Sequence, residues 1–141
     1  MKKCRMDEAA MRTFRTYARL GLCGSESALG IICRIRGICS DPAALDMLAV
    51  FDTMRLLELS GDDIALRAVE EVYFFAASHR LRANEITLRV RRLADELHCD
   101  DRTVYRHLKK ARDIWHTLRA KEKKQTAGER SLLNSMIGKI T

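Results

Sequence analysis

Proline occurs only once in the 141 residues, at Pro42, and this scarcity constrains the fold more than any other feature of the sequence. Proline breaks the interior of a helix, so a chain almost without it can be helical along most of its length. Apolar residues also recur every three or four positions, as on one side of a helix. We therefore expect an all-α fold.

Turn and capping residues divide the first half of the chain into expected helices. A first helix covers about 7–22. The segment 28–39 fits a strand or a helix, and helix is favoured because nothing else supplies strands for it to pair with. Ser40-Asp41-Pro42 predicts a helix start, with Asp41 as the cap, and this helix runs to about Leu59. Gly61 suits a left-handed helix exit, and a central helix then covers about 64–79.

The second half of the chain predicts two further helices separated by a tight break. After a basic connection at 79–83, Asn84 is expected to cap a helix that ends near Leu97. The break is at 98–100, and Asp100 or Asp101 caps a long helix to about Lys121. The predicted inner face of this long helix consists of Val104, Leu108, Ala111 and Trp115.

Charge is distributed unevenly, and this bears on where a polyanion could bind. The formal net charge is +7, but residues 40–78 carry two Lys or Arg against eight Asp or Glu. Residues 79–124 carry fourteen Lys or Arg against seven Asp or Glu. A basic segment favours nucleic acid or an anionic membrane surface. The stretch 79–124 is therefore the expected contact with a polyanion, and the acidic middle is not.

Other classes of function find little support in the sequence. No glycine-rich phosphate loop or catalytic triad is present, so we expect no enzyme and no cofactor. Five cysteines without C-x-x-C spacing indicate free thiols in a reducing cytoplasm; a zinc site at Cys99 with His98, His107 or His116 would lack the usual paired ligand spacing. No signal peptide or membrane span is expected, because no apolar run approaches about 20 residues.

Residues 84–118 meet the requirements of a helix-turn-helix. A small residue is needed where the two helices cross, and an apolar residue must fill the turn. Ala94 and Cys99 supply these, and Leu97 closes the first helix. We therefore expect a helical domain that ends in a helix-turn-helix, with a recognition helix at about Asp101–Arg119 in the major groove of DNA.

The outer face of that helix predicts the DNA contacts. Arg102 and Arg106 lie four residues apart, and either side chain can pair with guanine O6 and N7. The residues expected to meet bases are Arg102, Thr103, Tyr105 and Arg106. Those expected to meet phosphates, which set register and salt dependence, are Arg89, Arg91, Arg92, Lys109, Lys110 and Arg112.

Two stretches resemble a known family. Leu-Ala-Asp-Glu-Leu-His at 93–98 and Arg-Thr-Val-Tyr-Arg-His-Leu-Lys-Lys-Ala at 102–111 look like the helix-turn-helix of phage-encoded transcriptional regulators of the ArpU/RinA type. That motif is similar to region 4 of sigma-70 factors. The resemblance covers about residues 64–118 and implies sequence-specific binding to promoter or operator DNA. His98 departs from the pattern, because many such turns have glycine there.

These observations predict a regulator in three parts. Residues 1–78 form a helical platform or partner-binding region, 79–120 the DNA-binding region, and 121–141 a polar linker with a short amphipathic tail. Double-stranded DNA is the expected partner, with a homodimer favoured, and the acidic face at 41–71 is a candidate contact for RNA polymerase. The alternatives are a helix-turn-helix that docks other proteins, or a phage DNA-packaging or replication accessory factor.

Overall fold

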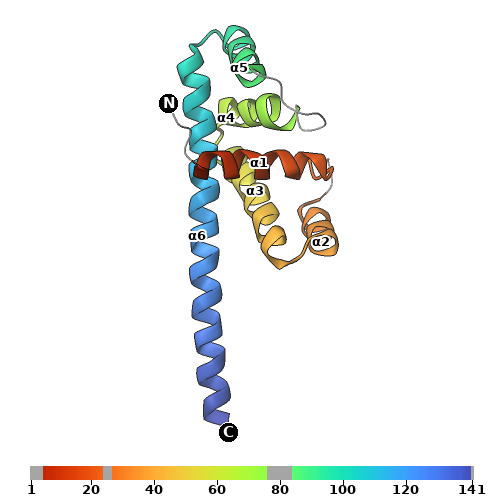
Figure 1. Ribbon diagram of the computed structural model, residues 1–141, viewed down its shortest axis with the longest axis vertical. Helices are drawn as coiled ribbons and strands as arrows, with labels where there is room; N and C mark the ends of the chain where they lie inside the picture. Colours follow the sequence, from red (N-terminus) through yellow and green to blue (C-terminus); the bar gives the residue numbers. More distant parts are fainter. Residues whose placement is uncertain (1–4, 24–26, 76–83, 141) are drawn as a thin grey trace.

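All secondary structure in the described residues (5–23, 27–75 and 84–140) of the computed structural model is helical (Figure 1). The expected all-α fold is confirmed, and the ambiguous segment at 28–38 is a helix. The elements in chain order are α1 (Arg5–Arg19), α2 (Ala28–Ile38), α3 (Asp41–Leu59), α4 (Asp63–Ala68), η1 (Val69–Phe74), α5 (Glu85–Glu96) and α6 (Asp101–Ile140).

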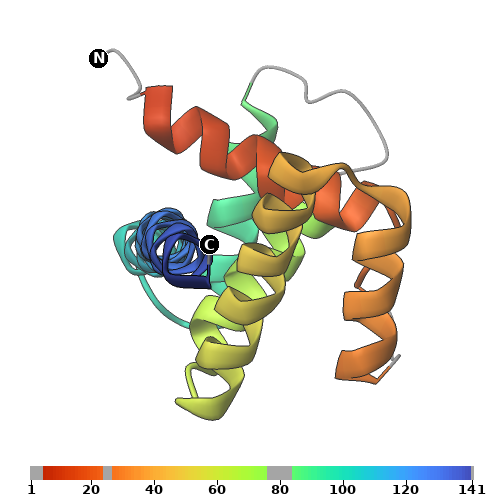
Figure 2. The same cartoon turned by 90° about the horizontal axis from the view of Figure 1, so that it is seen from below.

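Helices α1 to α5 gather around the N-terminal part of α6, which is by far the longest element (Figure 1). Seen from below, α6 and α2 lie on opposite sides of the molecule, with α1 and α3 between them (Figure 2). Among the described residues, no helix is both long and apolar enough to cross a membrane. The basic connection predicted at 79–83 lies outside the described residues.

One hydrophobic core joins the first half of the chain to the second. Phe14 of α1, Leu57 of α3 and Leu108 of α6 are almost completely buried in the same cluster. The rings of Phe14 and Tyr73 lie 5.7 Å apart between centroids, so α1 also packs on η1. The platform and the predicted DNA-binding region therefore share one interior.

Three helices end in the same hydrogen-bonded turn. At the ends of α1, α3 and α5, a residue with positive φ is followed by an amide that donates back to a carbonyl five residues earlier. Gly21 (φ 73°) and Gly61 (φ 72°) hold the first two of these positions, as glycine readily does. The exit predicted at Gly61 is confirmed, and Asp62 then caps α4 by accepting from Ala65 N at 3.1 Å.

The cap predicted at Asp41 is wrong by one residue. Ser40 is the N-cap of α3, and its side chain makes no capping hydrogen bond. Asp41 lies in the first helical turn, where its negative charge favours the positive end of the helix dipole. Asn84 does occupy the N-cap position of α5, but with φ 67° its side chain makes no capping bond.

Two predicted helices differ from the observed ones. The central helix expected at 64–79 is α-helical only to Ala68 and continues as the π-helix η1, in which Phe75 N donates to Glu70 O at 2.8 Å. The long helix expected to end near Lys121 continues to Ile140, so no break separates a linker from a tail. At 1.5 Å per residue, α6 is about 60 Å long.

Candidate nucleic-acid interface

Helices α5 and α6 are joined by the four-residue connection 97–100, at the position where the sequence predicts a helix-turn-helix. Cys99 N donates to Ala94 O at 3.0 Å and His98 N donates to Asp95 O at 3.3 Å, which closes the end of α5. His98 adopts the left-handed conformation with φ 54°, the geometry for which glycine is usual. The predicted tight break is therefore a hydrogen-bonded turn of defined shape.

The inner faces of the two helices pack as the sequence predicts. Ala94 is 2% exposed, and Leu97 and Cys99 pack against the core around the turn. Trp115 belongs to the core, with its indole N–H donating to the carbonyl of Asp46 in α3 at 3.2 Å. The buried residues on the inner face of α6 are Val104, Leu108, Ala111 and Trp115.

The opposite side of α6 presents most of the residues predicted to read bases. Arg102 and Arg106 are exposed, and the Tyr105 side chain between them is 41% exposed. Thr103 is half-buried near the start of the helix. Lys109 extends this side by a further turn, with its side chain 68% exposed and only a loose ion pair of 3.8 Å to Asp113. A surface of this kind has the positive charge and hydrogen-bond donors that a polyanion requires.

Two arginines of α5 add to this surface. Arg91 reaches the first turn of α6, where its Nε lies 3.8 Å from Asp101 Oδ2. Arg92 is more exposed, and its Nε lies 3.9 Å from Glu96 Oε1. Such exposed, long ion pairs contribute little to stability, so both guanidinium groups can exchange their partners for phosphate. We call Arg91, Arg92, Arg102, Tyr105, Arg106 and Lys109 the basic face.

The other three residues predicted to contact phosphates make closer contacts, mostly with other elements of the fold. Arg89 is half-buried: its guanidinium lies 4.6 Å from the centre of the Phe75 ring and 3.4 Å from Glu85. Arg112 donates to the hydroxyl of Tyr73 at 2.7 Å. Lys110 donates to the carboxylate of Asp62. The structure therefore places Arg89, Lys110 and Arg112 in contacts that fix α5 and α6 to the rest of the fold.

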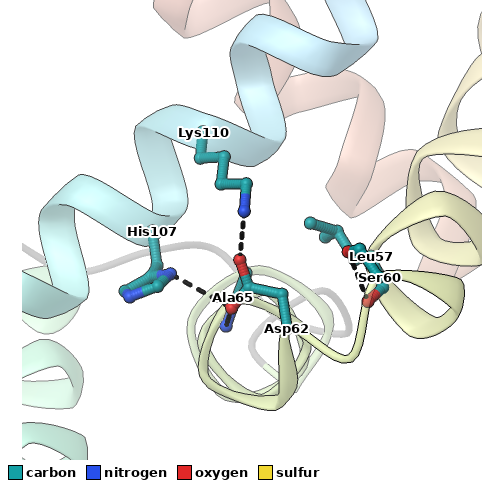
Figure 3. Close-up of polar contacts among 6 residues, drawn as sticks. All are labelled: Leu57, Ser60, Asp62, Ala65, His107 and Lys110. Carbon is teal, nitrogen blue, oxygen red and sulfur yellow. Dashed lines mark hydrogen bonds and ion pairs between the residues drawn. The ribbon is translucent and has the colours of Figure 1, made fainter.

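Asp62 is the central residue of one such contact (Figure 3). Besides capping α4 and accepting from Lys110, its carboxylate lies 3.3 Å from Nδ1 of His107. Burial, the largest single influence, raises the pKa of this carboxyl, but the hydrogen bonds from Lys110 and Ala65 and the charges of His107 and Lys110 outweigh it. The net effect is a pKa below the ordinary 3.8. The ionised carboxylate thus ties α6 to the start of α4.

A second contact joins α6 to α3. Arg119 Nε lies 2.8 Å from Asp46 Oδ1, and the Asp46 backbone accepts from Trp115. Asp46 is one of the carboxylates in the acidic segment 41–71 that the sequence offers to RNA polymerase. In the structure this half-buried carboxylate pairs with Arg119 of the same chain, and the contact helps to fix the direction in which α6 leaves the core.

Sequence reasoning found the residues of the basic face and a cap for α4 at residues 60–63, but it missed the long-range contacts of Asp62 and Asp46 with α6, whose partners lie 45 or more residues away along the chain. Comparison of the chain with protein-family models, with curated proteins and with solved structures finds no match.

Proposed function

We propose that the protein is a sequence-specific DNA-binding transcriptional regulator in which α6 enters the major groove with the basic face toward DNA. The observation that carries this proposal is the division of α6 into two sides. Val104, Leu108 and Ala111 hold one side on the core, while Arg102, Tyr105 and Arg106 project from the other. The N-terminal residues of a recognition helix are the ones that reach base edges.

The basic face offers both kinds of contact that such binding needs. Arg102 and Arg106 are one helical turn apart, so both guanidinium groups can address the same groove and pair with guanine. Arg91, Arg92 and Lys109 flank them on α5 and α6 and are suited to the phosphates on either side. Phosphate contacts supply affinity and register, whereas contacts with base edges supply sequence preference.

The test is fluorescence-anisotropy titration of a labelled duplex from the region upstream of the protein's own gene, against a scrambled duplex, at low and moderate salt. The variant is Arg102→Ala with Arg106→Ala. Because each guanine pair contributes about 1–3 kcal/mol of discrimination, we expect the preference for the native duplex to fall by at least about thirtyfold. The protein's affinity should also weaken steeply with salt.

The matched control is Arg12→Ala with Arg36→Ala, which removes the same charge from exposed positions of α1 and α2. We expect this control to keep the preference for the native duplex. Salt-sensitive binding that is equal for the two duplexes would favour a packaging or replication accessory role. An absence of binding to either duplex at low salt would contradict DNA binding and favour docking to another protein.

A further inference from the structure

The face of the molecule away from α6 contains a groove that the proposed DNA contacts do not use. Its volume is about 1120 Å³, and it is lined by the end of α1, the start of α2, the second half of α3, and α4 with η1. Half-buried Phe51, Met54, Leu66 and Phe74 form apolar surface within it. Leu59 and Phe75 also line it and are 76% and 69% exposed. Apolar side chains gathered in one groove, some of them this exposed, are typical of an interaction surface.

The groove is acidic as well as apolar. Among the described residues that line it, the charged side chains are the carboxylates of Glu58, Asp63, Glu70 and Glu71 and the guanidinium of Arg55. Within the described part of the chain, Glu58, Asp63 and Glu70 are exposed and form no salt bridge. An apolar surface edged by carboxylates is complementary to a helix that carries apolar and cationic residues.

The chain itself contains a helix of that chemistry. Residues 121–141, here called the arm, carry five Lys or Arg against two Glu. Their large apolar residues recur at spacings of three and four, as on one side of a helix: Leu132, Leu133, Met136, Ile137 and Ile140. The backbone of α6 continues through the arm to Ile140, and none of the other described helices runs beside this part of it (Figure 1).

The arm of a given chain is directed away from its own groove. It prolongs the axis of α6, whose direction is fixed on the core by Trp115 and Arg119. None of the described residues that line the groove belongs to α6. Helix α2, which forms one wall of the groove, lies on the opposite side of the molecule from α6 (Figure 2). A continuous helix cannot turn back through the core, so the groove that the arm can fill is that of another copy.

We propose that the protein forms a dimer in which the arm of each copy lies in the acidic groove of the other. The exchange is reciprocal, so both copies bury the same two surfaces, as a closed two-fold dimer requires. The positive arm then meets the carboxylates of the groove, and its apolar residues cover Leu59 and Phe75. The basic face takes no part in this contact, so the dimer forms without DNA.

The experiment is sedimentation equilibrium of the full-length chain and of charge-swapped variants, each checked for helical content by circular dichroism. The groove variant is Glu58→Lys with Glu70→Lys, and the arm variant is Arg130→Glu with Lys139→Glu. Each variant places like charges opposite one another, so we expect the dimer Kd to rise by at least about tenfold in both. A chain that carries all four substitutions should recover the dimer, because the swapped charges again attract.

The matched control is Glu8→Lys with Asp95→Lys, which reverses two exposed carboxylates outside the groove. We expect its Kd to equal that of the unchanged protein. A monomer at about 100 μM would overturn the proposal. A dimer whose Kd is unchanged in the groove variant would also overturn it, because the arms would then be pairing with each other. A chain that carries all four substitutions and stays monomeric would overturn it as well. DNA binding is measured separately by fluorescence anisotropy, so failure of the dimer proposal and failure of the proposed function can be told apart.

Discussion

His98 is the one non-glycine residue among the three that close a helix in the left-handed conformation. Gly21 and Gly61 adopt φ 73° and 72° with no Cβ to crowd the following carbonyl, whereas His98 does so with a full side chain. The His98 side chain is exposed and belongs to no contact of the core. The turn between α5 and α6 is therefore held against a local backbone preference.

Replacing His98 by glycine should stabilise the protein. We expect His98→Gly to raise the free energy of unfolding by up to about 1 kcal/mol, because the relief of the left-handed strain exceeds the added freedom of the unfolded chain. Urea unfolding followed by Trp115 fluorescence measures the change. The control is His98→Ala, which keeps a Cβ and should not stabilise; equal stabilisation by both substitutions would show that the backbone is not the cause.

Asp62 should make stability depend on pH in the acid range. Its folded pKa lies below the ordinary 3.8, so its stabilising contribution is fully present above the unfolded pKa and is lost as the pH falls through the folded value. Asp62→Asn keeps a good N-cap residue but removes the charge opposite Lys110 and His107. The unchanged protein should be more stable than this variant at about pH 6, and its advantage should disappear once the pH falls below the folded pKa.

A second substitution at the same position separates the cap from the ion pair. Asp62→Ala removes both, so it should lower the free energy of unfolding near neutral pH by about 1 kcal/mol more than Asp62→Asn does. Thermal or urea unfolding at neutral and strongly acidic pH provides the measurement. If the unchanged protein kept its full advantage in free energy of unfolding over the Asp62→Asn variant in strong acid, the ionised carboxylate could not be the source of that advantage.

Whether a side chain is buried or exposed was predictable from the sequence where it depends on neighbours along the chain. Val104, Leu108 and Trp115 follow one helical stripe, and all three are buried. Lys110 and Arg112 lie off that stripe and read as outward cations, but Asp62 and Tyr73 reach them from α4 and η1. Because those partners are supplied by tertiary packing, no local pattern could distinguish them from the cations of the basic face.

At the scale of elements, capping and turn residues located most helices, but two backbone features had no sequence signal. The change from α4 to η1 falls within an unbroken helical pattern, and a π-helix is rare enough that no pattern rule favours it. The continuation of α6 through Gly128 also goes against local preference, since glycine inside a helix costs about 1 kcal/mol relative to alanine. The predicted end at Lys121 rested on a different signal, because residues 120–128 have no apolar side that would pack against a core.

At the scale of the whole molecule, the shared core predicts that the platform and the basic face unfold together. Leu57 of α3 is fully buried, so Leu57→Ala should cost about 2–5 kcal/mol. The loss should appear as a lower urea midpoint of the Trp115 fluorescence transition, because Trp115 lies on α6 and reports on its unfolding. Leu56→Ala, at an exposed neighbouring position, is the control and should change the midpoint little. A Trp115 transition unaffected by Leu57→Ala would mean that α5 and α6 fold independently of α3.

Helix α6 is uninterrupted, so it can act as one rigid rod. The contacts of Asp46 and Asp62 hold it on the core, and about 20 residues, or about 30 Å, extend beyond them. A tilt of α6 by about 10° about these contacts would displace its C-terminal end by about 5 Å. Arg102 and Arg106 lie on the other side of these contacts from the C-terminal end, so a rigid tilt of the helix would move them in the opposite direction and by a smaller distance.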